Sequence, residues 1–216
     1  MNQMAPKRPE HETIYQTIKD MILFGEVVPG QPVTIHGLAE TINTGVTPVR
    51  EAIRRLTAEG ALTTLENRRI AVPEMTTHRL DQIAIVRQTV EPELAQMAAN
   101  LINNNVVDEL ERIDARIDEA IQTGDIRSYL EANYRFHFTL YDAAGAGILQ
   151  RIADSLWLRV GPSLRVVCGR YGTANLVDHH RAATAAIRNK DPEKVREAIA
   201  EDIHQGTNFV RQSLAE

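Results

Sequence analysis

The sequence has little cysteine, few aromatic residues and no long hydrophobic run. Cys168 is the only cysteine among 216 residues, which excludes an internal disulfide and favours a cytoplasmic location. Aromatic residues make up 5% of the chain, and alanine, isoleucine and leucine dominate its apolar content, as in helical bundles. No apolar run approaches the ~18 residues of a membrane span. The polar N-terminus predicts no signal peptide, so we expect no membrane partner.

An excess of positive charge is also missing. The formal net charge of −5 at pH 7 argues against a broadly basic surface for nucleic acid. Affinity for DNA would have to come from local arginines, doubled by a dimer. The length favours two domains, and the apolar content of 43% is ample for a core in each.

A short arginine-rich helix is predicted for residues 47–60, TPVREAIRRLTAEG. Thr47 is a suitable N-cap, and Pro48 fits the first helical position. Apolar residues at i, i+3, i+4 and i+7 form one stripe along it: Val49, Ala52, Ile53 and Leu56. Arg50 and Arg54 share one flank of that stripe, where their planar donor groups could meet guanine edges and phosphates. From the spacing alone, an ordinary solvated helix is an equally good interpretation.

The preceding residues favour DNA recognition. Residues 14–24 have a helical pattern that stops at a glycine, and Thr34 can cap a second short helix ending just before Thr47. Two helices joined by so short a turn, the second rich in arginine, are typical of a helix-turn-helix.

A β-hairpin is predicted after this pair of helices. Residues 62–65 and 70–72 are short β-prone runs separated by Glu-Asn-Arg-Arg. The hairpin would form a wing whose tip carries Arg68 and Arg69.

These residues resemble the winged helix of GntR-type bacterial transcriptional regulators. The resemblance rests on IYQTIKDMILFGEVVPG, LAETIN, TPVREAIRRLTAEGAL and the NRR of the wing. Family members usually carry Ser-Arg before the Thr-Pro and Asn-Arg-Gly in the wing, where this chain has Gly45-Val46 and Asn67-Arg68-Arg69. One base-reading arginine is therefore absent and one wing arginine is gained, so the operator need not follow the usual sequence. The expected DNA-binding residues are Thr47, Arg50, Arg54, Arg68 and Arg69.

From residue 78 onward the pattern is helical almost without interruption. The predicted helices span residues 78–102, 106–123, 126–144, 146–168, 175–190 and 192–214, and Gly161-Pro162 should kink or split the fourth. Six helices with short loops predict an antiparallel bundle, in which small-molecule sites lie between facing helices. We predict a mainly α protein with a flexible tail (1–10), a winged helix-turn-helix (11–73), a linker (74–77) and an all-helical effector-binding and dimerisation domain (78–216).

Several polar side chains fall on the apolar stripes of this bundle. Arg87 lies in the middle of one stripe, with Glu91 one turn on; the two could form an internal ion pair, or Arg87 could bind a carboxylate. Asn133 and His137 are four residues apart and can converge on one point, and His180 lines up with the apolar face of its own helix. By contrast, His204 projects away from the stripe of the last helix, so periodicity predicts that it is exposed.

The C-terminal part is similar to the effector domain (FCD) of FadR-type GntR regulators and to their shorter, VanR-like branch. The matching segments are VRQTVEPELAQMAA, NYRFHFTLYDAAG and HRAATAAIRNKDPEKVREAIAEDIH. Many members hold a divalent metal with an Asp and three His, and an organic acid completes the site. Carried over, the ligands are Asn133 in the Asp position, His137, His180 and His204. Imidazoles suit zinc or nickel, while an amide oxygen is a weaker ligand than a carboxylate. The expected effector contacts are Arg87, Asn133 and Tyr134.

Together these patterns predict a dimeric, ligand-responsive repressor that binds a double-stranded operator and a small carboxylate effector. A regulator with a metal-free pocket, built on Arg87, Asn133 and His137, is one alternative. A metalloenzyme is the other, because three histidines with an open coordination position could activate water. No acidic base is evident beside the histidines, however, and a winged helix would have no purpose in such an enzyme.

Overall fold

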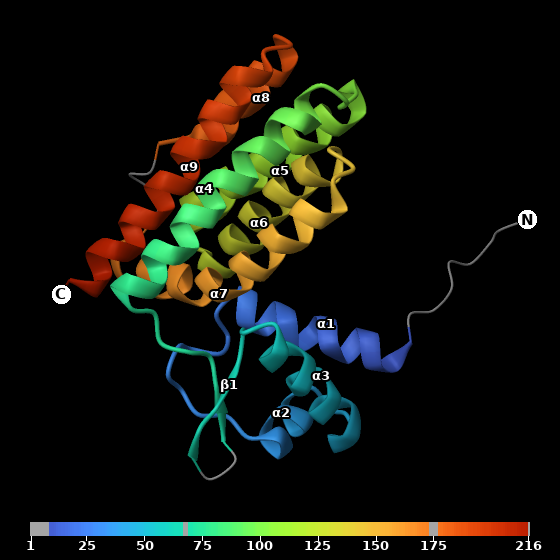
Figure 1. Ribbon diagram of the computed structural model, residues 1–216, viewed down its shortest axis with the longest axis vertical. Coiled ribbons are helices and arrows are strands. Elements are labelled where there is room, and N and C mark those ends of the chain that lie inside the picture. The colour runs from blue at the N-terminus through green and yellow to red at the C-terminus, as the bar shows by residue number, and fades with distance from the viewer. Residues whose placement is uncertain (1–8, 67–68, 173–176, 216) are drawn as a thin grey trace, which may run out of the picture.

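The computed structural model describes residues 9–66, 69–172 and 177–215. They form a small N-terminal part of short helices and a bundle of long C-terminal helices (Figure 1). The N-terminal elements are α1 (Glu10–Leu23), α2 (Ile35–Thr41), α3 (Val46–Ala58), β1 (Thr63–Thr64) and β2 (Ile70–Ala71). The bundle contains α4 (Thr77–Ala99), α5 (Asn104–Thr123), α6 (Ile126–Asp142), α7 (Gly147–Tyr171), α8 (His179–Arg188) and α9 (Pro192–Leu214). The predicted mainly α fold, a winged helix-turn-helix followed by a six-helix bundle, is confirmed.

The helix-turn-helix is held together by the apolar stripe of α3. Val49 and Leu56 are completely buried and belong to one core cluster with Ile18 and Ile22 of α1. Burial of these side chains is the main favourable contribution to the packing of α1 on α3. The predicted cap of α2 forms, since the Thr34 hydroxyl accepts the Gly37 N–H at 3.0 Å.

The start of α3 differs from the prediction. The helix begins at Val46 with Gly45 as the N-cap, and no side chain caps it, so Thr47 is the second helical residue and not the cap. Pro48 is then the third residue. This position is also tolerated, because the N–H groups of the whole first turn have no partner within the helix.

The wing is a minimal hairpin. Strands β1 and β2 are antiparallel and pair Thr63 with Ala71 and Thr64 with Ile70. Each has two residues and is shorter than predicted, but an isolated bridge from Val33 to Ile70 ties the hairpin to the chain before α2. Of the predicted tip, Arg69 is described and exposed, whereas Arg68 lies outside the described residues.

The predicted helices of the bundle all form, and the fourth is not split. Helix α7 continues through Gly161 and Pro162, and both residues are buried. Pro162 removes one backbone hydrogen bond, but packing against the end of α1 supports the helix there: an added Cβ on Gly161 would lie 2.6 Å from the Leu23 carbonyl oxygen. None of the helices in the described ranges is long and apolar enough to cross a membrane. Residues 1–8 of the predicted tail lie outside those ranges, and α1 begins at Glu10.

Polar contacts join the N-terminal part to the bundle. Lys19 of α1 is buried and pairs with Asp154 of α7 at 2.5 Å, and the Tyr134 hydroxyl of α6 donates to the same carboxylate at 2.7 Å. Arg159 of α7 donates to the Glu59 carbonyl at 3.0 Å, directly after α3. A cation suits this position because the C-terminal end of a helix carries partial negative charge.

The close approach at Gly161 leads to a first prediction. Gly161→Ala should destabilise the protein by about 1–3 kcal/mol, because the new methyl group meets a backbone carbonyl that cannot rotate away. Gly206→Ala is the matched control within α9: its nearest neighbouring atom is 3.9 Å away, so it should stabilise by roughly 0.5–1 kcal/mol. Urea unfolding of both variants measures the difference. Equal effects would show that α1 does not press on α7 at this point.

Candidate functional site

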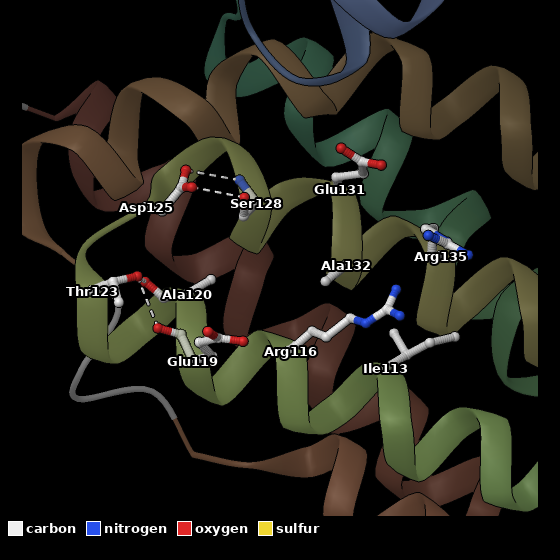
Figure 2. A pocket seen from close by; sticks show the side chains of 10 residues that line it. All are labelled: Ile113, Arg116, Glu119, Ala120, Thr123, Asp125, Ser128, Glu131, Ala132 and Arg135. Carbon is white, nitrogen blue, oxygen red and sulfur yellow. Dashed lines mark hydrogen bonds between the residues drawn. The ribbon is translucent and has the colours of Figure 1, made fainter.

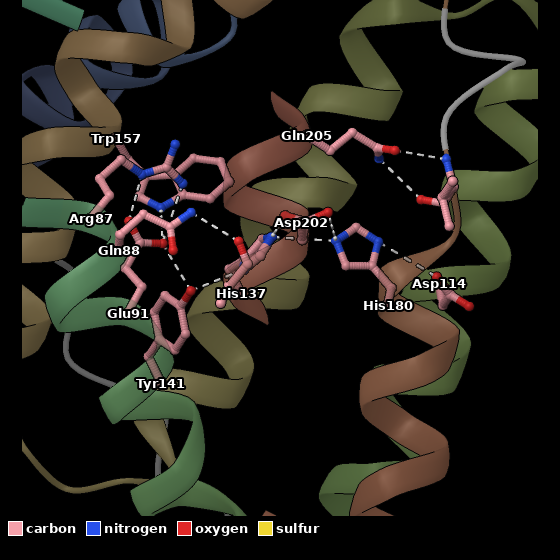
Figure 3. Close-up of polar contacts among 12 residues, drawn as sticks. Arg87, Gln88, Glu91, Asp114, His137, Tyr141, Trp157, His180, Asp202 and Gln205 are labelled. Carbon is pink, nitrogen blue, oxygen red and sulfur yellow. Dashed lines mark hydrogen bonds and ion pairs between the residues drawn. The ribbon is translucent and has the colours of Figure 1, made fainter. Parts of the chain in front are cut away.

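Three polar side chains from different helices meet inside the bundle. His137 of α6, His180 of α8 and Asp202 of α9 each bring one potential metal-ligand atom to within 4.8 Å of the others (Figure 3). His137 Nε2 lies 3.1 Å from the Asp202 Oδ2 atom and 3.3 Å from His180 Nε2. His180 Nε2 lies 3.7 Å from the other Asp202 oxygen. The three helices thus direct two imidazoles and one carboxylate to a common point.

The other nitrogen of His137 faces a second buried group. Its Nδ1 lies 3.0 Å from the Tyr141 hydroxyl, which donates to Glu91 Oε2 at 2.8 Å. Glu91 also accepts from Trp157 Nε1 at 2.8 Å and from Arg87, whose Nε lies 2.5 Å from Oε1. The side chain of Glu91 has no exposed surface, and a buried carboxylate needs such a full set of donors. The predicted internal ion pair of Arg87 and Glu91 is therefore present.

Burial and neighbouring charges determine the protonation of the cluster. Burial lowers the pKa of His180 to about 4, against a partial opposing effect of Asp202, so this imidazole is neutral at pH 7. Burial alone would raise the pKa of Asp202, but the nearby His180 and His137 hold it well below its usual range. Asp202 is therefore ionised and His180 keeps a lone pair, as metal ligands require.

A further carboxylate lies behind His180. Asp114 of α5 is buried, and its Oδ1 atom lies 3.7 Å from His180 Nδ1. Burial, reinforced by Asp178 and Asp118, raises the pKa of Asp114 to about 6. At 3.7 Å the two atoms are beyond hydrogen-bond distance, so Asp114 adds negative charge near His180 without fixing the orientation of the ring.

A small cavity adjoins the cluster. It has a volume of about 40 Å³, and its lining includes Arg87, Asn133 and Asp202. This is room for roughly three water-sized spheres, which suits an ion and its water ligands. Cys168 also lines the cavity, but burial raises the pKa of its thiol to about 12, so it is not a thiolate ligand at pH 7.

Of the predicted metal and effector residues, Arg87 and Asn133 line this cavity. His137 and His180 lie beside it and reach Asp202. His204 and Tyr134 do neither. His204 is exposed, as the periodicity of α9 predicts, and its Nε2 atom contacts Asn208 at 2.8 Å. Asp202, two residues earlier, takes the place that the FCD resemblance assigned to His204. Tyr134 faces α1 and α7 through Asp154 and is not among the residues that line the cavity. The sequence signal for Asp202 is its helical spacing, because it lies three residues after Ile199 and next to Ile203, both on the buried side of α9.

A wider groove lies between α5 and α6 (Figure 2). It has a volume of about 590 Å³ and contains none of the predicted effector residues. Its charged lining comprises Arg116, Glu119, Asp125, Glu131 and Arg135. Because acidic and basic groups are mixed there, the groove offers no clear preference for an anion.

The arginines of α3 have different surroundings. Arg50 is exposed and, within the described residues, has no ion pair, whereas Arg54 pairs with Glu51 at 2.6 Å. Arg55 turns toward α1, where it pairs with Glu12 at 2.9 Å and lies 3.6 Å from the centre of the Tyr15 ring. Arg55 thus has a structural role, and Arg50 and Arg54 remain available to a partner.

Comparison with known families agrees with the two parts of the fold. Residues 10–72 match the bacterial regulatory proteins of the gntR family, and residues 82–205 match the FCD domain. The chain belongs to the GntR family. GntR regulators bind DNA operators and small-molecule effectors, and FCD domains often bind a metal.

Individual GntR proteins are similar over nearly the whole chain. The HTH-type transcriptional regulator McbR of Escherichia coli (strain K12) is 28% identical over 198 residues, 90% of each protein. The Probable D-xylose utilization operon transcriptional repressor of Paenarthrobacter nicotinovorans is 25% identical over 201 residues, which cover 91% of this chain and 88% of that one. The solved structure of E. coli McbR/YncC superposes with a TM-score of 0.90 at 26% identity, covering 96% of this chain and 99% of that chain.

This GntR protein is a DNA-binding transcriptional regulator with an FCD effector domain. Its family and relatives are regulators and not enzymes, which removes the metalloenzyme alternative.

Proposed function

We propose that this GntR protein is a homodimeric transcriptional repressor located in the bacterial cytoplasm. We also propose that its FCD domain binds a small organic acid at a divalent metal ion. The observation that carries the proposal is the meeting of His137, His180 and Asp202. His137 Nε2 and the Asp202 oxygen lie 3.1 Å apart, and His180 Nε2 is 3.3 Å from His137 Nε2. Three potential ligand atoms this close repel one another unless a cation lies between them or an imidazole N–H donates a proton to a neighbour.

The donor set suits zinc or nickel. Two imidazoles and one carboxylate form the core of the proposed site. Asn133 lines the cavity beside Asp202 and is proposed to add an amide oxygen. Asp202 supplies the negative charge that Asn133 lacks, so a divalent ion with these ligands leaves a net charge of +1. That charge attracts an anionic effector to the remaining coordination positions.

Arg87 and Asn133 are proposed to contact the effector. Both line the cavity, and the Arg87 guanidinium lies 4.6 Å from the centre of the Trp157 ring. Pockets for organic ligands usually measure roughly 300–1,000 Å³, so a volume of about 40 Å³ has to widen on effector binding. Helix α7 borders the cavity through Trp157 and contacts α1 through Asp154. A shift of α7 that widens the cavity would therefore also shift α1 in the DNA-binding part.

A metal-free regulator is the second candidate, and one contact favours it. A doubly protonated His137 could donate to Asp202 across the same 3.1 Å. The proton would then take the place of the metal, and Arg87, Asn133 and His137 would bind the effector directly.

Substitution of Asp202 separates these candidates. Asp202→Ala should weaken zinc binding by at least about 100-fold, more than the loss of an outer-shell partner, because a direct ligand is removed. His204→Ala is the control, since it removes an exposed imidazole two residues away on the same helix and should leave the affinity unchanged. The measurement is calorimetry on protein purified without an affinity tag, with elemental analysis of the purified sample. Equal losses in both variants, or no zinc uptake by the wild type, would reject this ligand set.

The DNA contacts are proposed for Thr47, Arg50 and Arg54 of α3 and for Arg68 and Arg69 of the wing. When the protein binds an operator, Arg54 has to break its ion pair with Glu51 in order to contact DNA. The loss is small because both side chains are exposed and water already screens their charges. Arg50 has no such pair to break within the described residues, which makes it the clearest probe of base recognition.

Substitution of Arg50 tests this assignment. Arg50→Ala should weaken binding to a duplex selected from a random pool by about 1–3 kcal/mol and leave folding intact. Arg69→Ala should weaken binding evenly across sequences and lower the salt dependence, as loss of a phosphate contact does. Arg55→Ala, in the same helix, should lower stability instead because it loses Glu12 and Tyr15. Unchanged gel-shift affinity of Arg50→Ala would exclude α3 from the major groove.

Dimerisation is proposed through α4 and α7, which pack against each other and both carry exposed apolar side chains. Ile85 of α4 is 68% exposed and Ile148 of α7 is 71% exposed, although both are large and apolar. A second copy is the proposed partner, because a two-fold dimer doubles the few arginines on a pseudo-palindromic operator.

Light scattering at micromolar concentration should give twice the chain mass of 24.2 kDa for the wild type. The double variant Ile85→Glu/Ile148→Glu should be monomeric, because it places two charges in the interface. Val177→Glu, at an exposed position before α8, should remain dimeric. A wild type that is monomeric both free and on DNA would exclude the dimer.

A further inference from the structure

A continuous path of hydrogen bonds leads from the metal-site cluster to the centre of the bundle. It runs from His137 Nδ1 to the Tyr141 hydroxyl over 3.0 Å, and from that hydroxyl to Glu91 Oε2 over 2.8 Å (Figure 3). His137, Tyr141 and Glu91 are all completely buried, so water does not compete for these contacts. We infer that Tyr141 and Glu91 are positioning residues that hold His137 in its Nδ1–H tautomer and so keep Nε2 free to bind a cation. This inference rests on the proposed metal site and explains how the chain prepares it.

The direction of each hydrogen bond follows from the groups involved. A tyrosine hydroxyl carries one proton at neutral pH, and the Tyr141 oxygen lies 2.8 Å from Glu91 Oε2. A carboxylate only accepts, so that proton points to Glu91. The hydroxyl oxygen can then only accept from His137. The proton of a neutral His137 is therefore on Nδ1, and the lone pair of Nε2 faces Asp202 and His180.

Glu91 keeps its orientation because other donors surround it. Arg87 Nε lies 2.5 Å from Oε1, and Trp157 Nε1 donates to Oε2 at 2.8 Å. Oε2 is thus held where Tyr141 reaches it. The charge of Glu91 decides the direction of the whole path, because a neutral amide in its place could donate to Tyr141 and reverse both hydrogen bonds.

Among the described residues, the Nδ1 atom of His180, unlike that of His137, has no hydrogen bond that would fix its tautomer. This atom lies 3.7 Å from Asp114, beyond hydrogen-bond distance. The fixed tautomer is therefore a property of His137, which is the ligand nearest to Asp202.

The test reads the tautomer directly, in metal-free protein, from the ¹⁵N chemical shifts of His137 at mildly alkaline pH. The wild type should show a protonated Nδ1 and an unprotonated Nε2. Tyr141→Phe keeps the buried ring but removes the hydroxyl, so a mixture of tautomers is expected. Glu91→Gln should shift the proton to Nε2. Tyr129→Phe is the matched control: it removes a hydroxyl from α6 beside the same cavity and should leave His137 unchanged.

Zinc calorimetry on the same proteins supplies the second measurement. Tyr141→Phe should weaken zinc binding roughly 10–100-fold, the usual effect of losing an outer-shell partner, and Tyr129→Phe should not. Circular dichroism and the melting temperature check that Tyr141→Phe remains folded.

The two measurements separate failure of the inference from failure of the proposed site. A wild-type His137 that carries its proton on Nε2, that is doubly protonated, or that shows a tautomer mixture would overturn the positioning role. The same holds if Tyr141→Phe changes neither the tautomer nor the zinc affinity. A wild type with the Nδ1–H tautomer that takes up no zinc would instead reject the metal site and leave the hydrogen-bond path intact.

Discussion

A carboxylate in the middle of an apolar bundle has to be matched by donors, and Glu91 imposes this requirement on three helices. Arg87 comes from α4, Tyr141 from α6 and Trp157 from α7, and all three donate to this one side chain. Loss of any donor would leave part of a buried charge uncompensated, which is far more costly than the loss of a surface contact. The arrangement therefore sets the positions of α4, α6 and α7 relative to one another.

Helix α7 belongs to this arrangement and to the contact with the DNA-binding part. On one side, Trp157 faces Glu91 and His137. On the other, Asp154 forms an ion pair with Lys19 of α1, and Arg159 donates a hydrogen bond to the chain at the end of α3. These residues lie within two turns of one rigid helix. The state of the buried cluster and the placement of α3 consequently depend on the same element, which is what a ligand-responsive regulator requires.

Much of this organisation follows from periodicity and short motifs. The apolar stripe of α3 and the burial of Arg87 beside Glu91 could be predicted because each depends on residues a few positions apart. The ligand that we propose on α9 could not be taken from resemblance, which pointed to His204. The helical period, in contrast, correctly predicted that His204 is exposed. Asp202 lies on the buried side, and its role appears only when α6, α8 and α9 come together. Tyr134 was misplaced for a related reason: it lies next to Asn133 in sequence but faces α1, and only packing between distant segments decides that.

The contact between Gly161 and the Leu23 carbonyl has a mechanical consequence. Packed helices usually absorb small shifts through rotamer changes of the side chains between them, and at this point no side chain intervenes. A displacement of α7 at Gly161 should therefore move the end of α1 with it. The bundle and the DNA-binding part are joined here backbone to backbone, so a movement too small to rearrange a side chain is still transmitted.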